Sequence, residues 1–141
     1  VAGFTGVVGG QPLDTEDSAA IALKFDNGAF GTMTSGYYLD RRYHSQIKIW
    51  GSKGWLELRR LRGAAQEFPL EWYSTTETNP QIHRYKNPGT LAGYTPFVRA
   101  AVRAGAGLED PPLTAADGLQ VLKTIFAAYK AAETGRTQRV V

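Results

Sequence analysis

Between Glu16 and Leu58 the sequence alternates apolar and polar residues in four short runs, and glycine-containing turns separate these runs in pairs. Alternation with a period of two is typical of strands that bury one face. The turns are Asp26-Asn27-Gly28 and Gly51-Ser52-Lys53-Gly54, because Asn and Gly tolerate the positive φ angles that tight hairpin turns need. The stretch therefore predicts two hairpins. Their strands are expected over residues 18–25, 29–38, 43–50 and 55–60.

The rest of the chain predicts two further strands and then two helices. The strands are expected over residues 68–73 and 81–85. Beyond residue 89 the apolar spacing becomes helical, and Pro96 suits a first helical position with Thr95 as the cap. Thr114 and Asp117 have the spacing of a capping box for a second helix, which Gly135 would end.

This order of elements, strands first and helices last, is typical of an α+β domain. We expect an open, mostly antiparallel β-sheet with the helices packed on one face. Aromatic residues such as Phe30, Tyr37, Trp50 and Trp55 occur on both strand faces, so they cannot all contact the same helices. An uncovered aromatic face usually marks an interface. We therefore expect a homo-oligomer that forms through the open face of the sheet.

Length and composition exclude several classes of protein. A chain of 141 residues is enough for one compact domain, residues 1–141, and too short for a nucleotide-binding domain together with a substrate domain. The absence of cysteine excludes disulfides and thiolate metal sites, and two separate histidines, His44 and His83, do not make an imidazole metal site. We expect no metal.

Neither a membrane nor a nucleic acid is an expected partner. The apolar runs are shorter than the ~20 residues that a membrane-spanning helix needs, and the first residues lack the pattern of a signal peptide, so we expect a cytoplasmic protein. The formal net charge is only +3. Its basic residues are scattered, apart from Arg41-Arg42 and the group Arg59, Arg60 and Arg62, whereas a nucleic-acid binder concentrates them on one face.

Two patterns suggest catalysis at first sight and do not fit it. The glycine cluster at the start of the chain, GFTGVVGG, lacks the G-x-G-x-x-G order and the strand–helix context of a phosphate-binding loop. Glu16 and Asp17 are neighbours at the start of a strand, so their side chains point to opposite faces and would not act as an acid–base pair. We interpret them as the hydrophilic start of a strand.

The connection from Tyr37 to His44 is the densest cluster of functional side chains. Tyrosine and histidine form hydrogen bonds, and arginine binds carboxylate or phosphate groups with two parallel bonds, so such a loop can hold a polyhydroxylated or anionic small molecule. The competing interpretation is that the tyrosines pack the hairpin and the arginines are solvated. The candidate substrate-binding residues are Tyr38, Arg41 and Tyr43, with His83 and Tyr85 as a second, weaker cluster.

The motifs also occur in a characteristic order. ED-x₃-I-x-L-x-F-x-NGA-x-G is followed by I-x-I-x-G-x-x-G-x-L-x-L, then FVRA, then PPLTAADGLQVLKTIFAAYKAAETGR. From about residue 16 to residue 141 this order resembles the C-terminal domain of the Gfo/Idh/MocA family, the group of glucose–fructose oxidoreductase, inositol dehydrogenase and the rhizopine-catabolism proteins. Each motif is weak alone, and their order and spacing together are specific.

The resemblance implies a two-domain oxidoreductase that uses NAD or NADP. An N-terminal Rossmann domain, absent from this sequence, would hold the dinucleotide, and the C-terminal domain would line the substrate site and form the oligomer. Members of the family oxidise or reduce a hydroxyl or carbonyl group on sugars, cyclitols and related compounds. Tyr43 would occupy a place where the family sometimes presents a substrate-contacting aromatic residue, Arg41 lies two positions before it, and the segment from His83 to Tyr85 would edge the same pocket.

The catalytic residues of the family are not carried over. They are a Lys in an E-K-P motif and a His in a D-x-x-x-H motif. The first motif is missing, and Asp40 with His44 has the second spacing only by coincidence, because the pair lies after the glycine hairpin instead of before the sheet. We therefore expect neither catalytic nor cofactor-binding residues in this chain, and no catalysis by the chain alone.

Two other functions stay open at this point. One is a stand-alone sugar- or anion-binding or assembly module that uses the Tyr37–His44 loop. The other, which we consider weaker, is nucleic-acid binding through Arg59, Arg60 and Arg62, which would be steeply salt-dependent.

Overall fold

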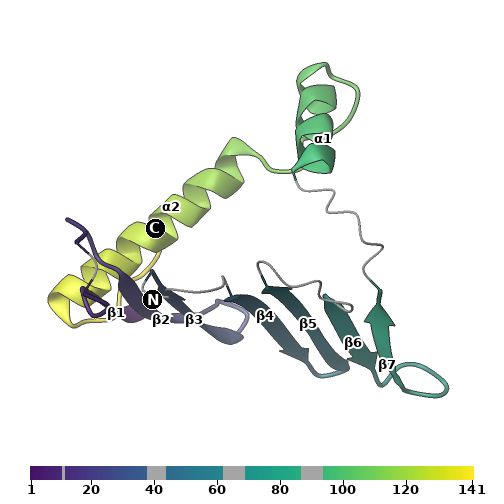
Figure 1. Ribbon diagram of the computed structural model, residues 1–141, viewed down its shortest axis with the longest axis horizontal. Helices are drawn as coiled ribbons and strands as arrows, with labels where there is room; N and C mark the ends of the chain where they lie inside the picture. Colours follow the sequence, from purple (N-terminus) through teal and green to yellow (C-terminus); the bar gives the residue numbers. More distant parts are fainter. Residues whose placement is uncertain (11, 38–43, 62–68, 87–93) are drawn as a thin grey trace. The chain divides into compact units, whose positions relative to one another are not determined.

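The computed structural model describes residues 1–10, 12–37, 44–61, 69–86 and 94–141 of the chain. In these ranges the predicted strands and helices follow one another in the predicted order, and a further strand at the start of the chain, which the sequence does not predict, precedes them (Figure 1). The strands are β1 (Ala2–Gly6), β2 (Ser18–Lys24), β3 (Phe30–Gly36), β4 (His44–Gly51), β5 (Gly54–Leu61), β6 (Leu70–Ser74) and β7 (Ile82–Tyr85), and the helices are α1 (Thr95–Gly105) and α2 (Ala115–Thr134). The chain divides into two compact units, Val1–Tyr38 with Tyr94–Val141 and Leu39–Gly93.

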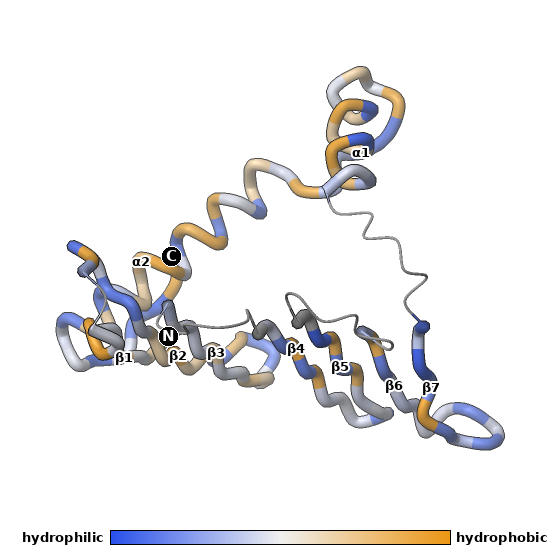
Figure 2. The backbone as a smooth tube through the Cα atoms, in the orientation of Figure 1, coloured by the Kyte–Doolittle hydropathy of each residue, from blue (hydrophilic) through white to orange (hydrophobic). Residues whose placement is uncertain are grey.

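The first unit contains an antiparallel sheet in the order β1-β2-β3 and the helix α2, which contacts β1. In β2 the side chains of Ile21 and Leu23 are half-buried and those of Ala20 and Ala22 are exposed, so one face of this sheet is covered and the other is open. The buried residues of α2 are small ones, Ala127, Ala128 and Ala131. Small side chains let a helix backbone approach a sheet closely. Figure 2 shows hydrophobic and hydrophilic residues alternating along α2.

The ends of α2 are those that its sequence predicts. The Thr114 side chain accepts a hydrogen bond from the Asp117 amide, the Asp117 carboxylate accepts one from the Thr114 amide in return, and Gly135 ends the helix in the left-handed region with φ 65°. The predicted cap of α1 is wrong by one residue. Tyr94, whose side chain makes no capping hydrogen bond, is the N-cap, because Pro96 is tolerated anywhere in the first helical turn where amides have no intrahelical acceptor.

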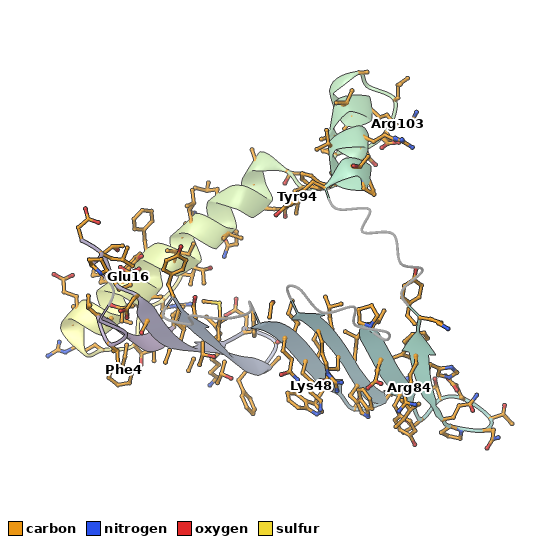
Figure 3. The ribbon with its side chains drawn as sticks, in the orientation of Figure 1. Phe4, Glu16, Lys48, Arg84, Tyr94 and Arg103 are labelled. Carbon is orange, nitrogen blue, oxygen red and sulfur yellow. The ribbon has the colours of Figure 1, made fainter. Side chains whose placement is uncertain are left out.

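The second unit is an antiparallel sheet in the order β4-β5-β6-β7, with two chemically different faces. The register and the period of two assign each side chain to a face. The aliphatic face carries Ile47, Ile49, Leu56, Leu58, Leu70, Trp72, His83 and Tyr85. The ionic face carries Gln46, Lys48, Trp50, Trp55, Glu57, Arg59, Glu71, Tyr73, Ile82 and Arg84. Figure 3 shows Lys48 and Arg84 on the same side of this sheet.

The predicted α+β class with antiparallel strands is confirmed. The strands belong to two sheets, whereas the sequence predicted one, because alternation identifies each hairpin but says nothing about whether successive hairpins share an edge. The prediction that helices cover one sheet face is confirmed for α2, and α1 has no buried residue. The single domain and the oligomer stay predictions. In the described part of the chain, no helix has the length and apolar character to cross a membrane.

Candidate functional site

The five predicted substrate-binding residues fall into two groups. Tyr38, Arg41 and Tyr43 lie outside the described residues, so their role stays a prediction. His83 and Tyr85 both lie on β7, at alternate positions, and therefore share the aliphatic face of the second unit's sheet. The candidate site is built from these two residues outward.

His83 is held by two neighbours. Its ring stacks on that of Trp72, with the ring centroids 5.2 Å apart and the planes inclined by 17°. Its Nε2 atom lies 2.7 Å from the Glu77 Oε2 atom. About a third of each side chain in the His83–Glu77 pair is exposed, 31% and 33%, so the pair is in reach of solvent and of a ligand.

The β6–β7 hairpin explains why these side chains meet. The register pairs Trp72 with His83 directly and Leu70 with Tyr85, and paired residues place their side chains on the same face. Glu77 lies in the turn that joins the two strands. Sequence reasoning found His83 but missed Trp72 and Glu77. Both residues lie in the predicted strands 68–73 and 81–85 or in the turn between them. The pairing of Trp72 with His83 could be derived only if the length of that turn were known.

This arrangement has the chemistry of a small-molecule contact. A carboxylate bound to one imidazole nitrogen fixes the orientation of the ring, and the tyrosine hydroxyl on the same strand both donates and accepts hydrogen bonds. Tyr85 is 52% exposed, so its side chain is in reach of a ligand. Trp72 and Leu70 add apolar side chains to the same face, of the kind that line ligand sites beside such polar groups.

At the centre of the ionic face, acidic and basic side chains in a row neutralise one another. Glu57 is only 4% exposed and contacts Arg59, Lys48 at 3.4 Å and the Gln46 amide at 2.7 Å. The hydrogen bond from Arg59, aided by Lys48 and opposed by burial, lowers the pKa of Glu57 to about 2. In the same row Glu71 binds Arg84 at 2.9 Å.

Arg59 is therefore engaged within its own sheet. Besides Glu57, its guanidinium contacts Glu71 at 3.6 Å, and its hydrogen bond to Glu57 raises the pKa of Arg59. Two acidic side chains thus neutralise Arg59, which belongs to the basic group that the sequence suggests for nucleic-acid binding. Lys48 also lies over the rings of Trp50 and Trp55, at 5.3 and 5.4 Å from their centroids, which orders this aromatic pair.

Asp17 corrects the interpretation of the strand start. It is only 3% exposed, and its carboxylate accepts hydrogen bonds from the amides of Val8 and Gly9 at 2.8 Å each and from the Ser18 hydroxyl at 2.7 Å. The interpretation as a hydrophilic strand start is wrong for Asp17, because a buried carboxylate supplies the acceptor that two loop amides need. Period-two alternation predicts that Asp17 points away from Glu16. The alternation does not reveal the distant amides that Asp17 binds.

The same contact decides how the glycine-rich segment can be used. A dinucleotide pyrophosphate would need successive free amides at the start of a helix. Here the segment runs from β1 into a loop, and the amides of Val8 and Gly9 are already bound to the Asp17 carboxylate. The residues present at this loop do not fit a nicotinamide dinucleotide. Among the described residues, no group of three or more His, Asp and Glu side chains is placed to hold a metal ion.

Glu16 connects the same loop to α2. The Tyr129 hydroxyl donates a hydrogen bond to the Glu16 carboxylate, which also accepts one from the Thr15 hydroxyl at 2.6 Å. These bonds, with Thr15 the larger cause, lower the pKa of Glu16, and the bond to Glu16 raises the pKa of Tyr129. The two adjacent carboxylates therefore bind separate partners.

Comparison with protein families gives a match over nearly the whole chain. Residues 3–140 match the family model described as the oxidoreductase family, C-terminal alpha/beta domain. A comparison with curated protein sequences found no significant match.

Solved structures give the same fold. An oxidoreductase domain protein from Kribbella flavida aligns with 99% of this chain at a TM-score of 0.80 and 24% identity. The WlbA dehydrogenase from Bordetella pertussis, solved in complex with NADH and UDP-GlcNAcA, aligns with 96% of this chain at a TM-score of 0.65 and 20% identity. At these identities the likeness shows the shared fold. The chain spans 44% and 36% of the length of these two proteins.

Proposed function

The chain belongs to the Gfo/Idh/MocA oxidoreductase family and represents its C-terminal α/β domain, and from this premise we propose that it is the substrate-pocket and oligomerisation domain of an NAD(P)-dependent oxidoreductase. The observation that carries the proposal is the family match over residues 3–140. The substrate would be a sugar, a cyclitol or a related compound with a hydroxyl or carbonyl group.

The cofactor would be bound elsewhere in the parent enzyme. The chain spans less than half of the neighbouring oxidoreductases, and its glycine-rich loop is bound by the Asp17 carboxylate, so this loop is unsuited to a pyrophosphate. When bound, the nicotinamide accepts or supplies the hydride. The residues of this chain would contribute binding and orientation of the substrate, and the chain alone would not catalyse the reaction.

The proposed substrate contacts are the sequence-predicted set together with its neighbours on β6 and β7. His83, oriented by Glu77, and Tyr85 offer hydrogen bonds to hydroxyl groups, and Trp72 offers an apolar surface. Tyr38, Arg41 and Tyr43 are proposed to complete the pocket wall. The WlbA complex with UDP-GlcNAcA supports a sugar-type substrate, since that dehydrogenase has the same fold.

Self-association is proposed through the open face of the first unit's sheet. Phe4 and Phe30 are 79% and 86% exposed and lie on the face that carries the exposed residues of β2. Figure 3 shows Phe4 on the side of β1 away from α2. Exposed aromatic residues on a sheet face favour association with a second copy.

The proposed setting is the cytoplasm, in keeping with a sequence that has no cysteine for disulfides.

Thermal-shift titration with sugars, cyclitols and sugar nucleotides tests the pocket. We expect stabilisation by at least one of these classes of ligand. The variants His83→Gln and Tyr43→Phe should reduce this stabilisation. The control variant Thr124→Ala, at a residue of α2, should leave it unchanged. Stabilisation that survives both pocket variants would contradict the proposed contacts.

Sedimentation equilibrium tests the proposed self-association interface. Phe30→Ser should weaken self-association, and the control Leu108→Ser, at a 65% exposed residue outside the strands, should leave it unchanged.

A second candidate function is a stand-alone sugar- or anion-binding module. The observation that favours it is the ready-formed His83–Glu77–Trp72 group, which needs no other domain to orient it. The two functions differ in the ligand affinity of the isolated chain. Strong sugar or phosphate binding by the isolated chain, lost in Arg41→Ala, favours the module. Weak binding that becomes strong only in the full-length oxidoreductase favours the domain.

A further inference from the structure

The β2–β3 turn carries a reactive dipeptide that the proposed function does not use. Asp26, Asn27 and Gly28 connect Phe25 to Ala29, whose carbonyl accepts a hydrogen bond from the Phe25 amide at 2.8 Å. All residues of the turn are exposed. Gly28 has φ +87°, and nothing lies within 4 Å of the position that a side chain would occupy there. The Asn27 side chain is therefore followed by a residue that has no side chain of its own to hinder attack by its backbone nitrogen.

We propose that Asn27 is a site of spontaneous deamidation, which converts it to aspartate and isoaspartate. In the first step the Gly28 backbone nitrogen loses its proton and bonds to the Asn27 Cγ atom. The Cγ–Nδ2 bond then breaks, and the side-chain nitrogen leaves as ammonia with the proton restored to it. The product is a five-membered succinimide ring, and no electrons are transferred to or from the chain.

Solvent water opens this ring in one of two ways. Attack at Cγ gives an aspartate side chain at position 27. Attack at the main-chain carbonyl carbon gives isoaspartate, in which the main chain runs through Cγ. Both products replace a neutral amide with a carboxylate and lower the formal net charge of +3 by one.

One hydrogen bond in the turn favours ring closure. The Ala29 amide donates to the Asn27 Oδ1 atom at 3.0 Å. Negative charge develops on this oxygen when Gly28 attacks, and a fixed N–H donor at that position stabilises it. The same bond restrains the Asn27 side chain within the turn.

A second hydrogen bond limits the rate of the reaction. The Gly28 amide donates to the Phe25 carbonyl at 3.0 Å, and this bond must open before the nitrogen can attack. Local opening of an exposed turn costs little free energy compared with global unfolding. We therefore expect the reaction in the folded protein, at a rate below that of the unfolded chain.

The chain contains its own controls. Its other asparagines, Asn79 and Asn87, are each followed by proline, whose nitrogen carries no hydrogen and cannot close the same ring. Asn27 is thus the asparagine at which the succinimide route is open.

The effect on the hairpin distinguishes the two products. Isoaspartate adds a methylene group to the main chain of a turn whose ends are fixed by the Phe25–Ala29 pair. Aspartate keeps the main chain unchanged and retains an oxygen that can accept from Ala29. The isoaspartate form should therefore unfold more easily, whereas Asn27→Asp should have nearly the stability of the original chain.

The test is incubation of the folded protein in mildly alkaline buffer, with peptide mapping by mass spectrometry at intervals. We expect a growing mass increase confined to the peptide with Asn27, both isomers in that peptide, and no change in the Asn27→Gln variant, in which ring closure is less favourable. A parallel sample in denaturant establishes how fast the unfolded chain reacts. If the folded protein shows no conversion over a period in which the denatured sample converts fully, the proposal is wrong. Equal conversion at Asn79 would also overturn it.

Discussion

Substitution of Asp17 by Ala tests whether a buried carboxylate holds the β1–β2 loop. The change removes the acceptor of the Val8 and Gly9 amides, which bind Asp17 at 2.8 Å each, at a residue that is 3% exposed. A hydrogen bond to a charged acceptor contributes about 1.5 kcal/mol or more, so the loss of both should cost about 3 kcal/mol. That is a large share of the roughly 5–15 kcal/mol that stabilises a domain.

Thermal unfolding followed by circular dichroism measures this loss as a shift in melting temperature. The matched control is Asp14→Ala, which removes the same charge from the same loop at an exposed position. We expect Asp17→Ala to lower the melting temperature by ~10 °C, and Asp14→Ala to change it little. Equal stabilities of the two variants would refute the argument, because the amides would then find other partners without cost.

Three further predictions concern local geometry and charge. Gly54→Ala should strongly destabilise or prevent folding, because φ is +149° and an added Cβ would lie 1.9 Å from a backbone oxygen of the neighbouring strand; near-normal urea unfolding would contradict this. Thr114→Ala should cost about 1 kcal/mol through loss of the capping box, measured against Thr124→Ala within the same helix. Because the folded pKa of Glu57 is lowered to about 2, its contact with Arg59 stabilises the protein above the usual carboxyl range and is lost as the pH falls toward 2. In Glu57→Gln this part of the acid dependence of unfolding should disappear, and an unchanged profile would contradict the assignment.

The sequence predicts the local elements well, because local chemistry determines them. Asp26-Asn27-Gly28 forms the turn between β2 and β3, and the Thr114–Asp117 capping box starts α2 where the spacing indicates. Each of these features depends only on residues a few positions apart. The first helical cap failed by one position, because proline restricts the backbone without selecting one position in the first turn.

Contacts between distant segments could not be predicted in this way. Asp17 binds amides eight and nine positions earlier, and Glu16 meets Tyr129 across 113 positions. The Trp72–His83 stack depends on the register of β6 and β7, which turn length sets and which alternation alone leaves open. His83 could be named as a candidate from its residue type, but its partners Trp72 and Glu77 could not.

We propose that this domain contributes substrate contacts and not the cofactor site. Calorimetric titration of the 141-residue chain with NADH and with NADPH tests it most directly. We expect no saturable binding of either dinucleotide, because the amides of Val8 and Gly9 in the glycine-rich loop are bound to Asp17. Stoichiometric binding with a micromolar dissociation constant would contradict it, and would place a dinucleotide site within this chain.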